Sequence, residues 1–450
     1  MARHSHGSPT STSSRSRAAR LGLVAAVMCV TACSSAPSAD APKALESPRL
    51  AREYAKALAA EAQDSTAAGP FLDLVDLVIA NPETPGALAA GSAALDALVV
   101  GTTAGLDGLG PTAIAFRSRE LFPRVVERLR LAWAAADRVP VPDGKGGSWR
   151  SRTLPFLRGS IAAALHELAL FQGDTAAAEL WASRRGCAPT ATAIAPLDWT
   201  PLRGLETPLP IGPDHAIEKS YPGIQPFAAA IVPEILHADR CQLDVNATSF
   251  LQGTRALVVD VIVPSAQTIH LALTSASAAV VEVGGVRALT RAFEAGGRPV
   301  ERRASIAVPQ GTIRVVVKLA QKSEGSLIEL DVLGDDGLPL RTHAPRPGET
   351  AKARAGKATA VEVAPLGPSE DDALLAAGGM LGLGEVRAAE HLLEVQRPAD
   401  AGGKTLPPNP AIALLYSRAI EAAEDLPEMK MTERIRASLE RVLAAWPKSW

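Results

Sequence analysis

The stretch "TIRVVVKL", residues 312–319, decides the fold because its apolar and polar side chains alternate. Every second residue from Ile313 to Leu319 is apolar, whereas Arg314 and Lys318 fall on the opposite side of an extended chain. A period of two is the period of a β-strand. We therefore predict a half-buried antiparallel strand whose apolar face lies in a core and whose charged face lies in solvent.

Neighbouring stretches repeat this alternation. In "SLIELDVL" (326–333), apolar side chains alternate with Glu329 and Asp331. Three further runs, "RALVVDVIVP", "TIHLALTS" and "AVVEVGG", have a strand-like composition, and Gly-Gly and Asp-Gly pairs mark turns. About seven short strands of this kind predict an antiparallel β-sandwich over residues 227–340.

The order of these strands resembles the PA14-type jelly-roll. The pieces that correspond to that family's strands are "LTSASAAVVEVGG", "GTIRVVVKLA" and "SLIELDVLGDDG". The resemblance implies a β-sandwich that presents loops for glycans or proteins. Ala276 and Ser277 replace the acidic pair that binds calcium in the sugar-binding members, so calcium-dependent lectin activity is not implied.

Helical periodicity replaces the strand pattern on both sides, over residues 48–187 and 369–447. In residues 119–137, apolar side chains recur every three or four positions and share one face of a helix, which must be buried. Ser369 and Asp372 form a capping box at the start of the second helical segment.

Residues 153–186 predict two antiparallel helices, because Gly173 ends the first helix and Asp174 caps the second. An Ala-rich helix after a Gly-Asp turn resembles a tetratricopeptide hairpin, and "GLGEVRAAEHL" (382–392) repeats the pattern. His166 departs from that family's consensus, which has a small residue there, and no regular repeat continues on either side. The resemblance implies a concave surface for protein or peptide partners.

Two segments lack a periodic pattern. Residues 188–226 contain eight prolines and predict a connector without regular structure that wraps over a surface. Residues 341–368 predict a second, basic linker. The expected fold class is therefore multidomain α+β, with tetratricopeptide-like helical hairpins flanking an antiparallel β-sandwich of the jelly-roll (PA14-like) type.

The N-terminal segment has the layout of an export signal. Arginines and no acidic residue precede the apolar run "LGLVAAVMCV" (21–30), which suits a signal but is too short to span a bilayer. The stretch "VTACSS" (30–35) resembles the lipobox of bacterial lipoproteins. That resemblance implies removal of residues 1–32, lipidation of Cys33 and a tether over residues 33–47.

The same lipoprotein resemblance implies a cellular location. Ser34 follows the cysteine, and the family rule then sends the protein to the outer membrane, facing the periplasm. Several acyl chains on Cys33 anchor firmly where one chain binds only marginally. The alternative is a plain secreted protein in which the cysteine is incidental.

The net charge and the cysteines limit the kinds of partner, disulfide and metal site that the sequence supports. Loss of four arginines with residues 1–32 turns the net charge of −2 into −6, so no nucleic-acid partner is indicated. Cys187 and Cys241 could form a disulfide between the helical and β parts, or could remain two unpaired thiols. His237 and Asp239 stand beside Cys241, but no second ligand cluster completes a metal site.

A search for catalytic motifs finds no nucleophile elbow, zinc-protease helix, Walker loop or dinucleotide fingerprint. We therefore predict no catalytic residue and no cofactor. His166 is interpreted as a structural histidine, and "GDDG" (334–337) as a tight turn. Arg117, Arg124 and Arg128 could bind an anionic envelope polymer or a partner's acidic patch, or could form a solvated face balanced by neighbouring glutamates.

The sequence as a whole predicts a non-catalytic, lipid-anchored cell-envelope protein that acts as a binding or scaffold module for proteins or peptides. One alternative is carbohydrate or peptidoglycan binding through the β-sandwich. A second follows from the domain order, which resembles the front portion of large envelope lipoproteins that continue into a transglutaminase-like segment. The chain would then be the non-catalytic N-terminal part of a larger enzyme and would continue beyond Trp450.

Overall fold

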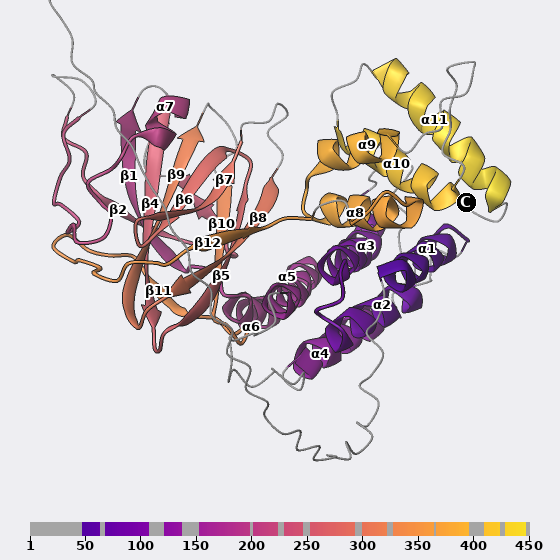
Figure 1. Ribbon diagram of the computed structural model, residues 1–450, viewed down its shortest axis with the longest axis horizontal. Helices are drawn as coiled ribbons and strands as arrows, with labels where there is room; N and C mark the ends of the chain where they lie inside the picture. Colours follow the sequence, from indigo (N-terminus) through magenta and orange to yellow (C-terminus); the bar gives the residue numbers. More distant parts are fainter. Residues whose placement is uncertain are drawn as a thin grey trace, which may run out of the picture. The chain divides into compact units, whose positions relative to one another are not determined.

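The computed structural model describes most of the chain from residue 47 onwards. Within the described residues the chain forms eleven helices and two antiparallel sheets (Figure 1), so the predicted α+β class is confirmed. The described ranges are 47–63, 68–107, 121–136, 153–198, 201–223, 229–245, 253–292, 299–321, 327–363, 366–395, 409–423 and 428–446.

The first sheet contains seven strands. They are β1 Thr190–Asp198, β2 Glu234–His237, β4 Gly253–Val263, β6 Ala278–Val283, β7 Val286–Arg291, β9 Gly311–Gln321 and β11 Arg341–His343. Their order is β2-β1-β4-β9-β6-β7, and β11 also pairs with β4. The central strands β4 and β9 pair along their whole length without a register break.

The second sheet contains five strands. They are β3 Leu243–Asp244, β5 Gln267–Ser275, β8 Val300–Val308, β10 Leu327–Leu333 and β12 Ala358–Val361. Their order is β12-β8-β5-β10-β3, and every neighbouring pair is antiparallel. Neighbours in this order are far apart in the chain, so the sheet closes only when distant segments meet.

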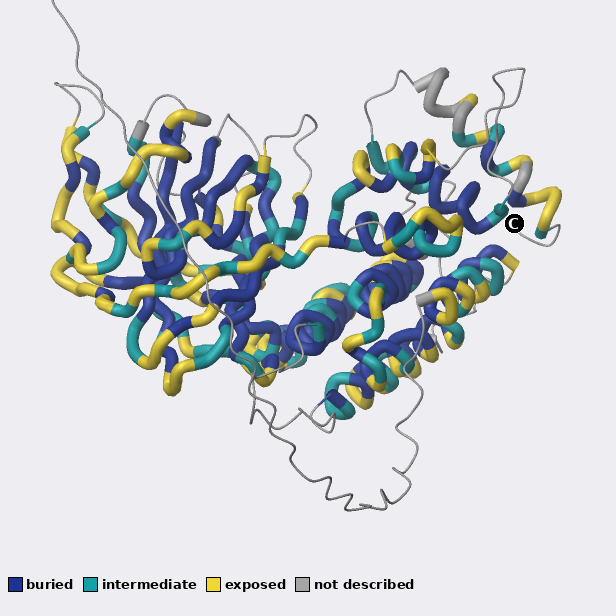
Figure 2. The backbone as a smooth tube through the Cα atoms, viewed as in Figure 1, coloured by how far each residue is buried: buried dark blue, intermediate teal, exposed yellow. Residues whose placement is uncertain are grey.

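The two sheets share one hydrophobic core. Ile313 and Val315 of β9 lie in it together with Leu271 of β5 and Val332 of β10, and all four are fully buried. Figure 2 shows the buried character of these strands. The apolar face predicted for residues 312–319 is therefore confirmed, and each such side chain contributes about 1.5–3 kcal/mol to the core.

The opposite face of β9 is not in solvent, so that part of the prediction is wrong. Arg314 and Lys318 are each 1% exposed. Arg314 forms a bidentate ion pair with Asp260 at 2.8 and 2.9 Å and also donates to the His215 carbonyl oxygen at 2.8 Å. The Lys318 ammonium donates to the Glu282 carboxylate at 2.7 Å. Buried charges require such partners.

Residues 188–226 were predicted to be a connector without regular structure. Their described part covers this face of the sheet, so that prediction is also wrong. Thr190–Asp198 is strand β1, which lies between β2 and β4, and Pro201–Glu206 is the short helix α7. Ile211 and Tyr221 then pack on the outer face of the first sheet. The small Thr and Ala side chains of β1 give a weak strand pattern in sequence. The second predicted linker likewise supplies β11 and β12.

The helices before and after the sheets belong to a single hydrophobic core. They are α1 Ser47–Gln63, α2 Gly69–Ala80, α3 Ala87–Asp107, α4 Leu121–Ala135, α5 Leu154–Gln172, α6 Thr175–Arg185, α8 Glu370–Gly382, α9 Val386–Val395, α10 Pro410–Ala423 and α11 Glu428–Ala445. Helix α8 lies beside α3 (Figure 1), and a Cβ on Gly379 would come within 2.7 Å of the Ala89 Cα. The two helical segments predicted on either side of the sheets thus form one body.

The predicted helix ends are confirmed. Gly173 ends α5 in the left-handed region with φ 71°, and Asp174 accepts a hydrogen bond from the Ala177 amide at 3.0 Å. Ser369 accepts one from the Asp372 amide at 3.1 Å at the start of α8. Each N-cap stabilises its helix by about 1 kcal/mol.

Helix α5 connects the helical body to the sheets. Among the described helices, α5 alone is long and apolar enough to cross a membrane, and most of it is buried inside the protein. Gly159 lets it approach the second sheet, because a Cβ there would lie 2.9 Å from the Leu333 side chain. Its apolar composition therefore serves packing on both sides.

Candidate functional site

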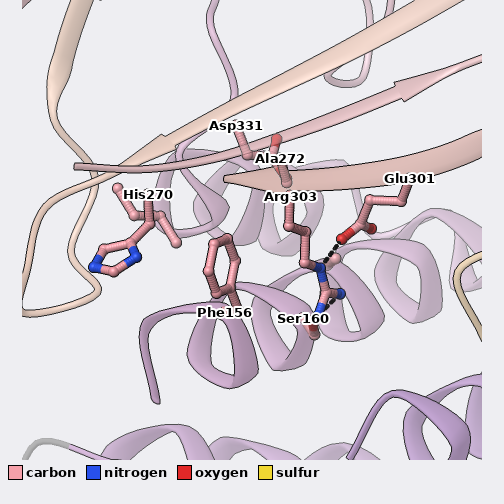
Figure 3. A pocket seen from close by; sticks show the side chains of 10 residues that line it. Phe156, Ser160, His270, Ala272, Glu301, Arg303 and Asp331 are labelled. Carbon is pink, nitrogen blue, oxygen red and sulfur yellow. Dashed lines mark hydrogen bonds and ion pairs between the residues drawn. The ribbon is translucent and has the colours of Figure 1, made fainter. Parts of the chain in front are cut away.

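A small cavity lies between α5 and the outer face of the second sheet (Figure 3). Phe156 and Ser160 line it from α5, and His270, Glu301 and Arg303 line it from the sheet. Its volume of about 20 Å³ is enough for one water molecule. The cavity is therefore part of the packing between helix and sheet.

The polar groups of this cavity hold α5 on the sheet. Arg303 donates to Glu301 and, at 3.0 Å, to the Ser160 hydroxyl (Figure 3). His270 Nδ1 lies 2.9 Å from the Ser305 hydroxyl oxygen. Burial lowers the pKa of His270 to about 4, so its ring is neutral at pH 7.

The end of α6 is attached to the second sheet by buried charges. Arg185 Nε donates to the Asp331 carboxylate at 2.7 Å, and its guanidinium also contacts Glu329. Burial raises the pKa of Asp331 to about 6, while Arg185 acts in the opposite direction. The alternation in residues 326–333 suggested a solvent face for Glu329 and Asp331, but Asp331 is buried and both carboxylates contact Arg185.

A larger cavity of about 720 Å³, the α6 groove, opens where α6 meets the sheets. Its volume is in the range of small-ligand sites, about 300–1,000 Å³. Three chain segments form its walls. The lining residues are His166, Leu170, Thr175, Ala178, Glu179, Ala182, Ser183, Gly186, Cys187, Pro189, Ala238–Cys241 and Pro339–Thr342.

One wall of the groove is a tight turn. The Asp239 and Gln242 backbones exchange hydrogen bonds at 2.9 and 2.8 Å, and the two residues between them, Arg240 and Cys241, have φ of 50° and 70°. This is the conformation of a type I′ turn, which favours Gly and Asn. Each L-residue held there costs about 1–2 kcal/mol, so other contacts must hold the turn.

A disulfide supplies such a contact. Cys241 is bonded to Cys187, two residues after the end of α6, and their Cα atoms lie 5.4 Å apart, within the usual range. Of the two arrangements left open by the sequence, the structure contains the disulfide. It joins the turn to the end of α6, and it removes Cys241 as a thiolate ligand for a metal.

One of the residues that line the groove is a buried histidine. His166 is 1% exposed, and its Nδ1 lies 2.9 Å from the Ala178 carbonyl oxygen. Because a carbonyl only accepts, Nδ1 carries a proton and donates it to this hydrogen bond. Nε2 is buried and has no hydrogen-bond partner among the described residues.

The rim of the groove carries charges of both signs. Glu179, Asp239, Arg240 and Arg341 all line it and are exposed. None of the four forms an ion pair with another described residue. Balanced charge suits a dipolar ligand better than a polyanion or a polycation.

Of the predicted arginine set, the structure describes Arg124 and Arg128. Arg128 is occupied by Asp73 at 3.1 Å and by Asp76, both on α2. Arg124 is exposed, and Arg117 lies outside the described residues. The packing of α4 against α2 therefore uses Arg128 for a tertiary ion pair, which the local charge pattern did not indicate.

Of the remaining predicted positions, some lie outside the described residues and others lie within them. Cys33 and the whole signal segment lie outside the described residues. The "GDDG" stretch is a turn in which Asp336 accepts from the Leu338 amide at 2.9 Å and Gly337 has φ 72°. In the described part of the chain, no group of three or more His, Cys, Asp or Glu side chains could hold a metal ion.

No protein-family model, curated protein or solved structure matches this chain. Most of the groove was not found by sequence reasoning, because its walls come from three distant segments. The signals in the sequence were His166, a polar side chain at a helical position where a small residue is typical, and the Cys187 and Cys241 pair, which also line the groove.

Proposed function

We propose that this protein is a lipid-anchored component of the bacterial cell envelope that works without catalysis, as a binding module for proteins or peptides. The observation that carries the binding role is the α6 groove, a cavity of about 720 Å³ that both apolar and polar side chains line, with charges of both signs at its rim. The export signal and the "VTACSS" lipobox support the anchor at Cys33.

The finer description of the fold belongs to the same proposal. The α5–α6 hairpin is of tetratricopeptide type, supported by the left-handed Gly173 and the Asp174 cap. The α8–α9 hairpin has an equivalent turn, in which Gly384 has φ 77°. The paired sheets form a PA14-like jelly-roll. In this description the groove lies between a helical hairpin and the sandwich.

Blocking the groove tests the binding role. Ala182 lines the groove from α6, whereas Ala176 is exposed on the same helix and does not line it. Ala182→Trp should obstruct the groove and reduce cross-linking of the anchored protein to its partner in intact cells. Ala176→Trp should leave the cross-links unchanged.

Two results would contradict the proposal. Cross-linking that persists equally in both variants would remove the groove from the function. Retention of the Ala182→Trp protein on purified cell-wall glycans, at the level of the unmodified protein, would favour the carbohydrate-binding alternative.

A further inference from the structure

We infer that the α6 groove binds a short peptide whose amino and carboxyl termini are both free, so that the ligand is a zwitterion. The guanidinium groups of Arg240 and Arg341 bind its carboxylate. The carboxylates of Glu179 and Asp239 bind its ammonium group. The inference rests on the proposed peptide-binding function and specifies the peptide. Its physical basis is that all four side chains line the groove and are exposed there.

These four rim charges are available to a ligand. Elsewhere on the described surface, exposed charges do pair: Arg287 lies 2.6 Å from Glu206, and Arg354 lies 2.5 Å from Asp214. Among the described residues, none of the four rim side chains has such a partner. A ligand group of opposite charge therefore displaces only water from them, and no ion pair within the protein has to break.

The presence of both signs restricts the charge of the ligand. A polyanion would meet Glu179 and Asp239 unfavourably, and a polycation would meet Arg240 and Arg341 unfavourably. A molecule with one group of each sign can pair with both sets. Arginine is always protonated in proteins, and its planar guanidinium donates two parallel hydrogen bonds to a carboxylate. A free C-terminal carboxylate and a free N-terminal ammonium group supply the two charges.

The size of the groove limits the length of the peptide. Its volume of about 720 Å³ equals that of a cube with an edge of roughly 9 Å, and each extended residue spans about 3.3 Å, so about three residues fit. Leu170, Ala178 and Ala182 line the same groove and offer apolar contacts to the middle of such a peptide.

The disulfide holds the charged walls at a fixed separation. Cys187 lies two residues after the end of α6, the helix that carries Glu179. Cys241 belongs to the same turn as Asp239 and Arg240. Charges that are already in place cost less entropy on binding. Arg240 has φ 50° where glycine or asparagine is favoured, and residues held at such a cost are typical of binding sites.

The test compares four forms of one tripeptide that differ only in their charged ends. The probes are trialanine, its N-acetyl derivative, its C-terminal amide and the doubly capped peptide. NMR titration of the full, disulfide-intact chain should give the tightest binding for trialanine, about tenfold weaker binding with either cap, and the weakest binding with both. The backbone amide resonances of Glu179 and Arg240 should shift with trialanine.

Arg240→Gly gives a second comparison, because it removes the guanidinium and relaxes the left-handed turn. Its thermal stability should rise while its affinity for trialanine falls by about fivefold. It should also discriminate less between trialanine and the C-terminal amide. Arg346→Gln, at an exposed arginine that does not line the groove, should change neither stability nor affinity.

The outcomes separate this inference from the proposed function. Equal affinity for the four peptides would overturn the recognition of charged ends and leave peptide binding in the groove intact. Binding by none of them would also overturn the inference, and cross-linking of the Ala182→Trp and Ala176→Trp proteins in cells would judge the proposed function separately. Unchanged affinity of Arg240→Gly would overturn the role of that arginine.

Discussion

Arg418 on α10 donates a hydrogen bond to Glu61 on α1 at 2.9 Å, across a sequence separation of 357 residues. Glu61 is 3% exposed, so its carboxylate depends on this guanidinium for a charged partner. The pair joins α1 and α10. The helical body is therefore completed only when the chain after the sheets has returned to it.

Removal of this guanidinium should destabilise the whole chain. Arg418→Ala leaves the Glu61 carboxylate buried without its partner, and we expect the free energy of unfolding to fall by about 3 kcal/mol. Urea unfolding followed by circular dichroism measures this loss.

An exposed pair on the next helix provides the control. Arg436 lies 3.5 Å from Glu440, and both side chains are mostly exposed. Arg436→Ala should change the free energy of unfolding by less than about 0.5 kcal/mol. Equal effects of the two substitutions would show that the Glu61 pair does not join the two helical segments.

Acid should destabilise the protein through His270. Burial lowers the pKa of His270 to about 4 from 6.5, so the unfolded chain binds more protons between these values. The free energy of unfolding therefore falls as the pH drops from 6.5 to 4. His270→Gln cannot bind this proton and should lose about 3 kcal/mol less over this interval, measured by urea unfolding at both ends.

Asp331 lines the same small cavity as His270, and its protonation changes the free energy of unfolding in the opposite direction. Burial raises its pKa to about 6, so its protonation adds stability as the pH falls from 6 to 4. The comparison of unmodified and His270→Gln chains cancels that contribution. His237→Gln, at an exposed histidine, should retain the full acid loss. The same acid loss in all three proteins would place the sensitive group elsewhere.

The turn at the groove wall should respond to the backbone preference of its residues. Arg240 has φ 50°, so Arg240→Gly should raise the free energy of unfolding by about 0.5–1 kcal/mol, because glycine adopts this region without steric cost. Arg240→Val should lower it by about 1–2 kcal/mol, since β-branched residues disfavour positive φ. Thermal unfolding of the three proteins gives the order, and a reversed order would exclude a left-handed turn.

The disulfide should be a major source of stability. Cys187 and Cys241 are separated by 54 residues in sequence, and closing a loop of this length in the unfolded chain contributes about 4 kcal/mol. The double variant Cys187→Ser, Cys241→Ser should lose that amount in urea unfolding. Addition of a reductant should lower the stability of the unmodified protein and leave the double variant unchanged. Sensitivity of the variant to reductant would contradict this assignment.

Local patterns predicted the elements that have a strong periodicity or a clear cap. The alternation around Ile313 predicted β9 and its core face, and Gly173 and Asp174 predicted the turn between α5 and α6. These features depend on neighbours in sequence, so the printed residues contain the information. The Ser369 cap belongs to the same class.

Features that depend on distant segments were not predictable in this way. Arg314 looked solvent-exposed because its partner Asp260 and the covering segment lie far from it in sequence. The groove escaped prediction for the same reason, since His166 meets Arg240 and Arg341 only after the sheets close. A periodic pattern identifies which face is apolar, but it does not show what covers the other face.

The most direct test of the account is metabolic labelling with an alkyne fatty acid of cells that express the unmodified chain, Cys33→Ala or Cys29→Ala. We expect label on the unmodified chain and on Cys29→Ala, none on Cys33→Ala, and a mature labelled protein in the envelope fraction that begins at residue 33. Equal labelling of Cys33→Ala, or an unlabelled protein free in solution that begins at another residue, would contradict the lipid-anchored envelope module.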